Sequence, residues 1–301
     1  MNGILLVDKP AGWTSHDVVA KLRGVLGERR MGHSGTLDPM ATGLLVVFAG
    51  RATRAVSFSE NHTKCYEAHL RLGLTTDTQD TTGTVLSRSE RAVSRAELEA
   101  VLPQFRGDIL QVPPMYSAVK VNGKKLYELA REGKEIARKA RTIEVYDIRI
   151  RRFLPPDRVE MDIDCSKGTY IRTLCADIGK ALGCGGHMAE LLRTATGSFS
   201  LENAIRLDDL KALAEQERAE EALLTMQEAL RDFPVIKIAE GSTKLLYNGG
   251  KIQEKYFTKQ PKALQEDEIA AVYDFENHLV GLYTLKKEET NFYIKPFKML
   301  V

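Results

Sequence analysis

The sequence has few of the features that mark membrane, secreted or zinc-binding proteins. No segment approaches the run of about 18 apolar residues that a membrane-spanning helix requires. Residues 1–10 lack the charged start and the long apolar stretch of a signal peptide. The four cysteines, at positions 65, 165, 175 and 184, have neither the C-x-x-C spacing of zinc sites nor the density of a disulfide framework. We therefore expect a cytoplasmic protein with no zinc site and no disulfide framework.

The chain also has little net charge, +2 over 301 residues, so its overall charge does not identify a nucleic-acid partner. The distribution of charge is less even. Between Val119 and Arg152, eleven Lys or Arg residues face five Asp or Glu residues, with aromatic and flexible residues between them. Such a stretch suits either an arm that lies on a phosphate backbone or a solvated helix surface. Composition alone leaves both interpretations open.

Strand and helix patterns follow one another in irregular order, which favours an α+β fold with a mixed sheet over a doubly wound parallel sheet. Capping residues and apolar spacing predict helices at 14–27, after Ser94, and at 171–182. Apolar or alternating runs predict strands near the N-terminus, at 44–49, 66–74, 143–153 and 159–165, and from Val85 onward.

The C-terminal third has a different pattern. The acidic segment 207–230 predicts a helical stretch that packs behind the preceding domain and leads to a boundary near Phe233 and Pro234. Beyond that boundary, short apolar runs separated by turn residues predict a small β-rich module from about 235 to 301.

The glycine-rich loop from Gly32 to Gly43 contains the most concentrated polar chemistry of the chain. It holds His33 and Asp38, and the proline that follows Asp38 excludes that residue from a helix. The apolar run 44–49 comes next and should form a buried strand that anchors the loop. An Asp-Pro pair in such a loop is commonly a simple turn, and a lone histidine is commonly structural. The loop by itself therefore leaves turn and catalytic site as alternatives.

Four other segments change this balance because they occur in register with the loop. With the loop, the segments in order are Asp8–Ser15, Gly32–Pro39, Lys64–Ala68, Ser117–Gly123 and Lys167–Leu174. Taken in this order, they resemble the TruB family of pseudouridine synthases over about residues 3–210, and the tail is similar to the PUA RNA-binding module.

The resemblance implies a fold and an activity. The fold is a pseudouridine synthase domain at 1–233, with a largely antiparallel central sheet flanked by helices, and a PUA-like barrel at 235–301. The activity is conversion of uridine 55 in the T-arm loop of tRNA to pseudouridine, without a cofactor, by a monomer that needs no obligatory protein partner and no membrane.

The resemblance also assigns roles to single residues. Asp38 is the catalytic carboxylate, acting on the sugar or the base or removing a sugar proton, and Arg172 pairs with it. Tyr66 stacks on the target base and helps to remove the proton from C5. The residues expected to bind RNA or support the site are His33, which holds the flipped nucleotide out of its loop, and Tyr170, Lys9, Lys64 and Lys120. The basic segment 117–141 is the expected RNA-gripping insertion.

Two alternatives to a stand-alone enzyme remain at this point. One is a guide-RNA-dependent pseudouridine synthase of the Cbf5/dyskerin type, which shares the Thr-Leu-Asp-Pro element. The other is a non-catalytic protein that binds or folds RNA, in which Asp38 is only structural. A sugar-nucleotide hydrolase is disfavoured because no second catalytic carboxylate stands out near the loop.

Overall fold

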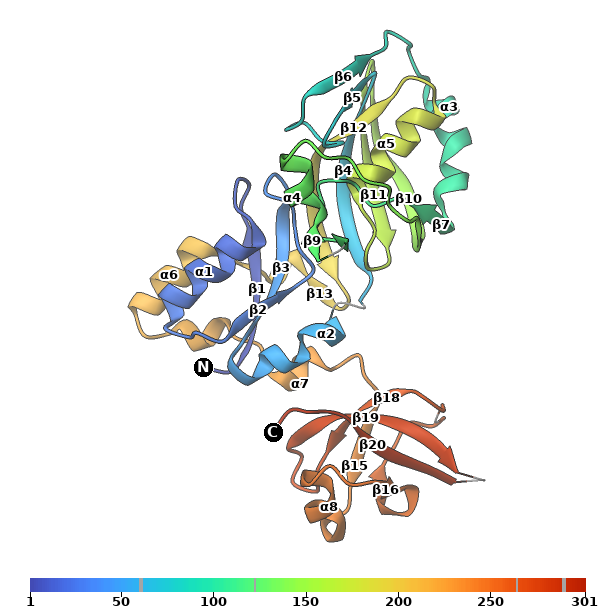
Figure 1. The fold of residues 1–301 in the computed structure, drawn as a ribbon. Coiled ribbons are helices and arrows are strands. Elements are labelled where there is room, and N and C mark those ends of the chain that lie inside the picture. Colours follow the sequence, from blue (N-terminus) through green and yellow to red (C-terminus); the bar gives the residue numbers. More distant parts are fainter. Residues whose placement is uncertain (60–61, 122, 264, 289–290) are drawn as a thin grey trace.

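Two β-sheets organise the chain. The structure, a computed structural model, describes residues 1–59, 62–121, 123–263, 265–288 and 291–301. Figure 1 shows an elongated molecule in which the larger sheet and its helices form the main body and the smaller sheet lies at one end. In the described ranges, no helix is both long and apolar enough to cross a membrane.

The larger sheet is mixed and largely antiparallel, as expected from the sequence. Its strand order is β14-β1-β3-β12-β4-β11-β10-β7, with β2 beside β3 and β13 beside β12. The pairings β1–β14 and β3–β12 are parallel, and the other described pairings of this sheet are antiparallel. Its strands are β1 Gly3–Lys9, β2 Met31–Ser34, β3 Thr42–Ala49, β4 Lys64–Leu72, β7 Gly107–Gln111, β10 Arg141–Leu154, β11 Arg158–Cys165, β12 Gly186–Thr196, β13 Phe199–Ser200 and β14 Ile205–Arg206.

The three expected helices form at the predicted positions, two of them with the predicted caps. Helix α1 (Ser15–Leu26) begins with a capping box between Thr14 and Asp17 and ends at Gly27, whose φ of 64° suits a residue without Cβ. Ser94 and Glu97 form the same box at α3 (Arg95–Val101). Helix α5 (Ile171–Ala181) packs on β12.

Two sequence predictions need correction. The acidic stretch 207–230 is not one helix: α6 (Leu207–Glu215) ends where Glu217 takes a left-handed φ of 59°, and Thr225 caps a separate short helix, α7 (Met226–Ala229). The strand expected at 66–74 ends at Leu72, because Gly73 has a φ of 79° and turns the chain.

Short elements complete the main body. They are the 3-10 helices Gly50–Ala55, Leu102–Phe105, Leu201–Asn203 and Ala219–Ala222, helix α2 (Val56–Ser59), and the hairpin of β5 (Leu74–Thr76) and β6 (Val85–Arg88).

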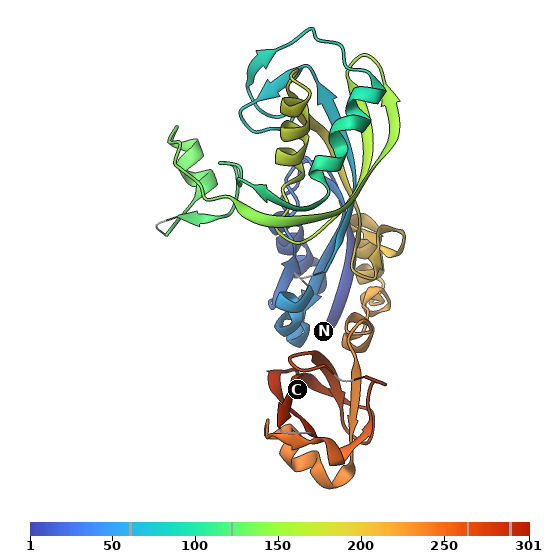
Figure 2. The same ribbon diagram turned by 90° about the vertical axis from the view of Figure 1, so that its right-hand side faces the viewer.

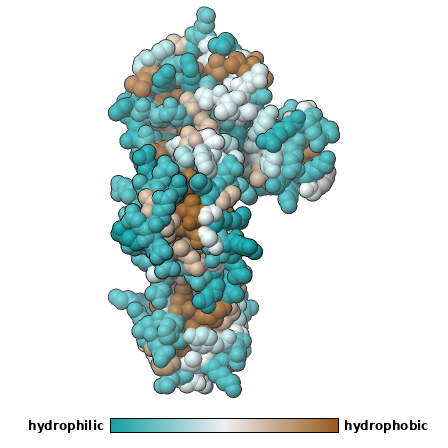
Figure 3. Space-filling view, turned by 90° about the vertical axis from the view of Figure 1, so that its left-hand side faces the viewer, coloured by the Kyte–Doolittle hydropathy of each residue, from teal (hydrophilic) through white to brown (hydrophobic). Residues whose placement is uncertain are grey.

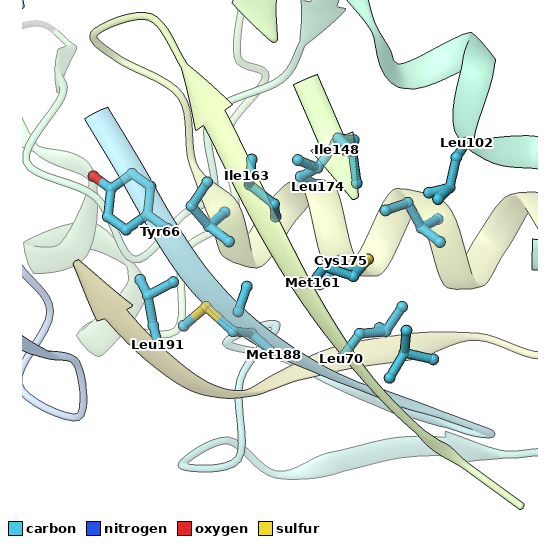
Figure 4. Close-up of a cluster of buried hydrophobic side chains, with 14 of the residues drawn as sticks. Tyr66, Leu70, Leu102, Ile148, Met161, Ile163, Leu174, Cys175, Met188 and Leu191 are labelled. Carbon is cyan, nitrogen blue, oxygen red and sulfur yellow. The ribbon is translucent and has the colours of Figure 1, made fainter. Parts of the chain in front are cut away.

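The core between α5 and the sheet is aliphatic (Figure 4). Leu70 and Met188 from the sheet and Leu174 from α5 are all inaccessible to solvent. Burying each such side chain stabilises the fold by about 1.5–3 kcal/mol. Tyr66 lies at one end of this cluster, with its hydroxyl directed away from the aliphatic side chains.

Between β7 and β10 the chain leaves the body as an arm. It contains the short hairpin of β8 (Lys120–Val121) and β9 (Lys124–Lys125), followed by helix α4 (Leu126–Arg131). Figure 2 shows the arm projecting from the side of the sheet, and Figure 3 shows that its surface is mostly hydrophilic. Asn122, part of the expected Ser117–Gly123 motif, lies outside the described residues.

The smaller sheet forms the β-rich C-terminal module, in the order β16-β20-β19-β18-β15-β17. Its elements are β15 Val235–Ile238, α8 Thr243–Tyr247, β16 Ile252–Gln253, β17 Phe257–Lys259, β18 Ile269–Tyr273, β19 Leu279–Glu288, β20 Asn291–Met299, and 3-10 turns at Glu240–Ser242 and Glu254–Tyr256. This nearly closed sheet is consistent with the PUA-like barrel. Leu282 and Leu300 from this module share a buried cluster with Ile4 and Phe48 of the main body. The two sheets are therefore joined by a hydrophobic interface.

Candidate active site

The loop that carries Asp38 connects β2 to β3, and hydrogen bonds to Ser15 and Gly12 hold it in place. The Ser15 hydroxyl, at the start of α1, accepts from the Leu37 amide at 2.9 Å and lies 3.2 Å from the Leu37 carbonyl, to which it donates. The Gly12 amide donates to the Pro39 carbonyl at 2.8 Å. Because these bonds fix the backbone on both sides of Asp38, its carboxylate has a defined position at the loop surface, with 36% of the side chain exposed.

Arg172 binds the carboxylate of Asp38 in a two-point arrangement. Its Nε lies 2.8 Å from Oδ2, and its Nη2 lies 3.3 Å from Oδ1. The arginine comes from the first turn of α5, as the sequence indicated, and only 5% of its side chain is exposed. A planar guanidinium bound at two points fixes the orientation of a carboxylate as well as its charge.

A second carboxylate contacts the same guanidinium. Asp80 Oδ2 lies 3.7 Å from Arg172 Nη1, and its other oxygen accepts from the hydroxyls of Thr78 and Thr82 at 2.7 and 2.6 Å. In the sequence no second carboxylate stood out near the Asp38 loop, and Asp80 belongs to a separate polar loop at residues 77–84. The acidic, threonine-rich composition of that loop was the available signal. Asp80 is 6% exposed and anchors Arg172 from the side of the guanidinium that Asp38 does not use.

Arg172 is also held by the backbone. Its Nη1 donates to the Thr78 carbonyl and its Nη2 to the Tyr116 carbonyl, both at 2.9 Å. Tyr116 is where the arm leaves the body, so the arm base, the 77–84 loop and Asp38 meet at one side chain.

Burial raises the pKa of the Asp38 carboxyl above its ordinary value, and Arg172 opposes that shift. Asp80 raises the pKa further, whereas Lys9 lowers it. The ionised form of Asp38 therefore depends on the cations around it.

Tyr66 lies on β4, next to the site, and is 7% exposed. It is directly opposite Arg193 of β12, which in turn is opposite Gly43 of β3. A Cβ at Gly43 would lie 2.4 Å from the Arg193 carbonyl oxygen, so this position requires glycine. Burial raises the pKa of the Tyr66 phenol.

His33 is half-buried at the end of β2, and its ring makes an edge-on contact with His16 at 5.4 Å. Burial lowers its pKa to about 4, and the neighbouring His16 and Arg193 act in the same direction. The imidazole is therefore uncharged at neutral pH. Its Nδ1 is buried and has no hydrogen-bond partner within the described part of the chain.

Lys9 and Lys64, which are expected to bind RNA or support the site, are both buried. Lys9 is fully buried, and its Nζ donates to the carbonyls of Trp13, Pro10 and Pro39 at 2.6, 2.9 and 3.3 Å. Lys64 is 6% exposed and donates to the His62 carbonyl at 3.0 Å. Both lysines therefore bond to backbone carbonyls near the site, a position that suits a supporting role.

Tyr170 and Lys120 are more exposed than Lys9 and Lys64. Tyr170 is half-buried directly before α5, and its amide and carbonyl bond to the side chain of the buried Gln111 at 2.8 and 3.1 Å. Lys120 is exposed on the arm.

Two clusters elsewhere have the spacing to hold a metal ion: Glu67 with His69 and Glu160, and Asp274 with Glu276 and His278. Neither includes a residue of the Asp38 site, and members of each are engaged in ion pairs.

Two family models match consecutive parts of the chain. Residues 23–171 match the TruB family pseudouridylate synthase N-terminal domain, and residues 172–233 match the tRNA pseudouridylate synthase B C-terminal domain. A protein of Alkaliphilus oremlandii named tRNA pseudouridine synthase B is 43% identical over 301 residues, which cover 100% of this chain and 99% of that protein. A protein of the same name from Syntrophotalea carbinolica is 46% identical over 249 residues, 82% of this chain and 81% of the relative.

Solved structures with a similar fold come from ribonucleoprotein assemblies. A chain of a Cbf5–Nop10–Gar1 complex has a TM-score of 0.79 and 29% identity, with 99% of this chain and 85% of that chain covered. A chain of an H/ACA RNP bound to a substrate RNA containing 2′-deoxyuridine has a TM-score of 0.78 and 26% identity, with the same coverage.

Proposed function

Because the chain belongs to the TruB family of pseudouridylate synthases and is an enzyme that forms pseudouridine in tRNA, we propose that its target is uridine 55 of the T-arm loop and that Asp38 is its catalytic carboxylate. The observation that carries the assignment of Asp38 is its two-point pairing with the buried Arg172, beside Tyr66 and at the surface of a fixed loop.

The reaction is an isomerisation. The bond between N1 and C1′ breaks, the uracil rotates, and C5 bonds to C1′. C5 then loses its proton and N1 gains one, so no oxidant or group donor is needed. A carboxylate that attacks the sugar or the base, or that removes a sugar proton, must be ionised. The Arg172 guanidinium favours the ionised form of Asp38 and fixes the orientation of the Asp38 carboxylate oxygens.

The neighbouring residues fit the remaining tasks. Tyr66 presents a rigid ring for stacking, which is worth about 1–3 kcal/mol per base in single-strand recognition. His33, uncharged at neutral pH, fits the role of holding the flipped nucleotide out of its loop, an extrusion that costs a few kcal/mol. Tyr170 flanks the site. Lys120 and the arm supply positive charge to the RNA backbone.

We further propose that residues 1–233 form the catalytic domain, with the arm at 117–141 gripping RNA, and that residues 235–301 form an RNA-binding domain. The separate core of the smaller sheet supports this division, as does the end of the second family match at residue 233. The enzyme then acts as a cytoplasmic monomer without a guide RNA or protein partner.

Purified protein alone, incubated with an unmodified T-arm stem-loop, tests the target. Pseudouridine should form at the position of uridine 55, and a stem-loop with cytidine at that position should yield none. Formation of product only when a guide RNA or partner proteins are added would instead support the Cbf5 type, and product at another uridine would refute the target.

A further inference from the structure

Arg193 is a buried cation that the proposed mechanism does not use. It is 0% exposed and is the largest fully buried side chain in the described part of the protein. Its Nε donates to the Leu44 carbonyl at 2.7 Å and its Nη2 to the Gly35 carbonyl at 3.0 Å. Its third nitrogen, Nη1, is buried and has no hydrogen-bond partner among the described residues.

Burying a guanidinium with one unbonded nitrogen is energetically unfavourable for a residue that only fills the core. Buried charges in proteins are normally paired, because an unpaired charge loses its hydration. No carboxylate lies within 4.0 Å of the Arg193 guanidinium in the described ranges. A neutral side chain with N–H donors could bond the same two carbonyls. These hydrogen bonds therefore do not explain why the buried residue at this position is charged, and the charge of Arg193 needs a separate role.

The position of Arg193 suggests that role. On β12 it lies directly opposite Tyr66 on β4, and side chains of directly opposed residues in an antiparallel pair point to the same face. It also reaches the Asp38 loop: a Cβ at Gly35 would lie 3.2 Å from Nη1. Arg193 thus contacts the Asp38 loop at Gly35 and lies directly across the strand pair from Tyr66.

We propose that Arg193 is a positioning residue for pseudouridine formation, a buried cation that fixes the loop through Gly35 and stabilises the Tyr66 phenolate that accepts the C5 proton. The proposal rests on the function proposed above. In this step the Tyr66 hydroxyl first gives its proton to solvent. After C5 has joined C1′, the C5–H bond breaks and the C5 proton passes to the Tyr66 phenolate. The electron pair re-forms the C5–C6 double bond, and N1 takes up a proton from solvent.

The charged and titratable groups around Tyr66 act in opposite directions. Burial raises the pKa of the phenol, and Cys165 on β11 and Asp38 on the loop raise it further. Arg193 is the one group among the cited causes that lowers it. Loss of the Arg193 charge should therefore make the phenolate harder to form.

The test places 3,5-difluorotyrosine at position 66 and follows its ionisation by fluorine NMR in otherwise wild-type protein, R193Q, R193K and R23Q. Arg23 is the matched control, since its Nη2 donates to the Met31 carbonyl of β2 at 3.0 Å and it is not part of the site. The phenol pKa should rise by about one unit or more in R193Q, a factor of ten or more in phenolate population. It should stay near the wild-type value in R193K and R23Q. An unchanged pKa in R193Q overturns the proposal.

Turnover supplies the second readout. R193Q should slow single-turnover pseudouridine formation by about tenfold or more, within the range ascribed to general-base catalysis, while RNA affinity stays near wild type. Difluorotyrosine at position 66 should restore part of that loss, because a more acidic phenol compensates for the missing charge. Absence of rescue, or a wild-type rate in R193Q, contradicts the proposal.

Should R193Q fail to fold, R193K decides, because it retains the cation: a folded R193K whose Tyr66 pKa has risen by more than a unit refutes the role. The fluorine titration needs no turnover, so it stays informative if Asp38 or uridine 55 is wrongly assigned.

Discussion

Arg172 binds Asp80 and Asp38 through different nitrogens. Nη1 lies 3.7 Å from Asp80, whereas Nε and Nη2 face Asp38. The guanidinium therefore lies between a partly exposed carboxylate, Asp38, and one that is almost fully buried, Asp80. Asp80 should act by holding Arg172, not by touching the substrate.

Asp80→Asn should lower the single-turnover rate by about 10-fold to 100-fold, the size of effect expected when a supporting partner of a site residue is lost. RNA affinity should change by less than about threefold, because Asp80 lies below the surface. Rapid-quench kinetics and filter binding measure the two quantities.

Asp77→Asn is the matched control, since Asp77 belongs to the same loop and accepts from the Thr84 amide at 2.7 Å rather than from Arg172. Equal rate losses in the two variants would show that only the loop fold matters.

The pH dependence should report the ionisation of Asp38. Burial raises the pKa of this carboxyl and Arg172 opposes the rise, so the reactive anion is lost on acidification at a higher pH than for an exposed aspartate. The rate should fall as pH falls, and Arg172→Gln should move this acid limb to higher pH. Single-turnover rates of wild type and Arg172→Gln, measured at saturating enzyme between about pH 4 and pH 8, test this shift of the acid limb. A limb that does not move in Arg172→Gln contradicts the assignment.

Lys120 and Lys9 should respond differently to salt. Lys120→Gln should weaken RNA binding and reduce the slope of log K against log salt by about 0.7–0.9, the value for one lost phosphate contact. Lys9→Met should leave the slope unchanged and lower the melting temperature, because the Lys9 ammonium bonds three loop carbonyls and is fully buried. A reduced slope in Lys9→Met would show that Lys9 reaches the RNA after all.

The interface between the two sheets should contribute to the stability of the whole chain. Leu282→Ala removes a fully buried side chain from the cluster shared with Phe48, and large-to-small changes of this kind cost about 2–5 kcal/mol. Urea unfolding measures this. Leu245→Ala, at a side chain that is 43% exposed, is the control and should cost little. Similar losses in both variants would argue against a specific interface.

Local signals in the sequence were sufficient for much of the fold. Helix α1 follows from a capping box at Thr14 and a terminal Gly27, and the strand after the Asp38 loop follows from the apolar run 44–49. The break at Glu217 was missed because nothing in the helical pattern requires a left-handed residue there.

The long-range parts of the site could not be obtained in this way. Asp80 and Arg172 are 92 positions apart and meet only because the 77–84 loop folds back over α5. The sequence also does not predict the burial of Lys9. Lysine is rarely buried, and the carbonyls that bind the Lys9 ammonium come from two separate loops. The pairing of Tyr66 with Arg193 depends on strand register, which no local pattern specifies.

The central claim is that Asp38 is the reacting carboxylate, and Asp38→Asn tests it most directly. The side chain keeps its size and loses its charge, while the loop bonds through Leu37 and Pro39 do not involve it. Single-turnover assays with a T-arm stem-loop should detect no pseudouridine, while RNA affinity stays within about threefold of wild type. Pseudouridine formation by Asp38→Asn at a rate near that of wild type would contradict the account.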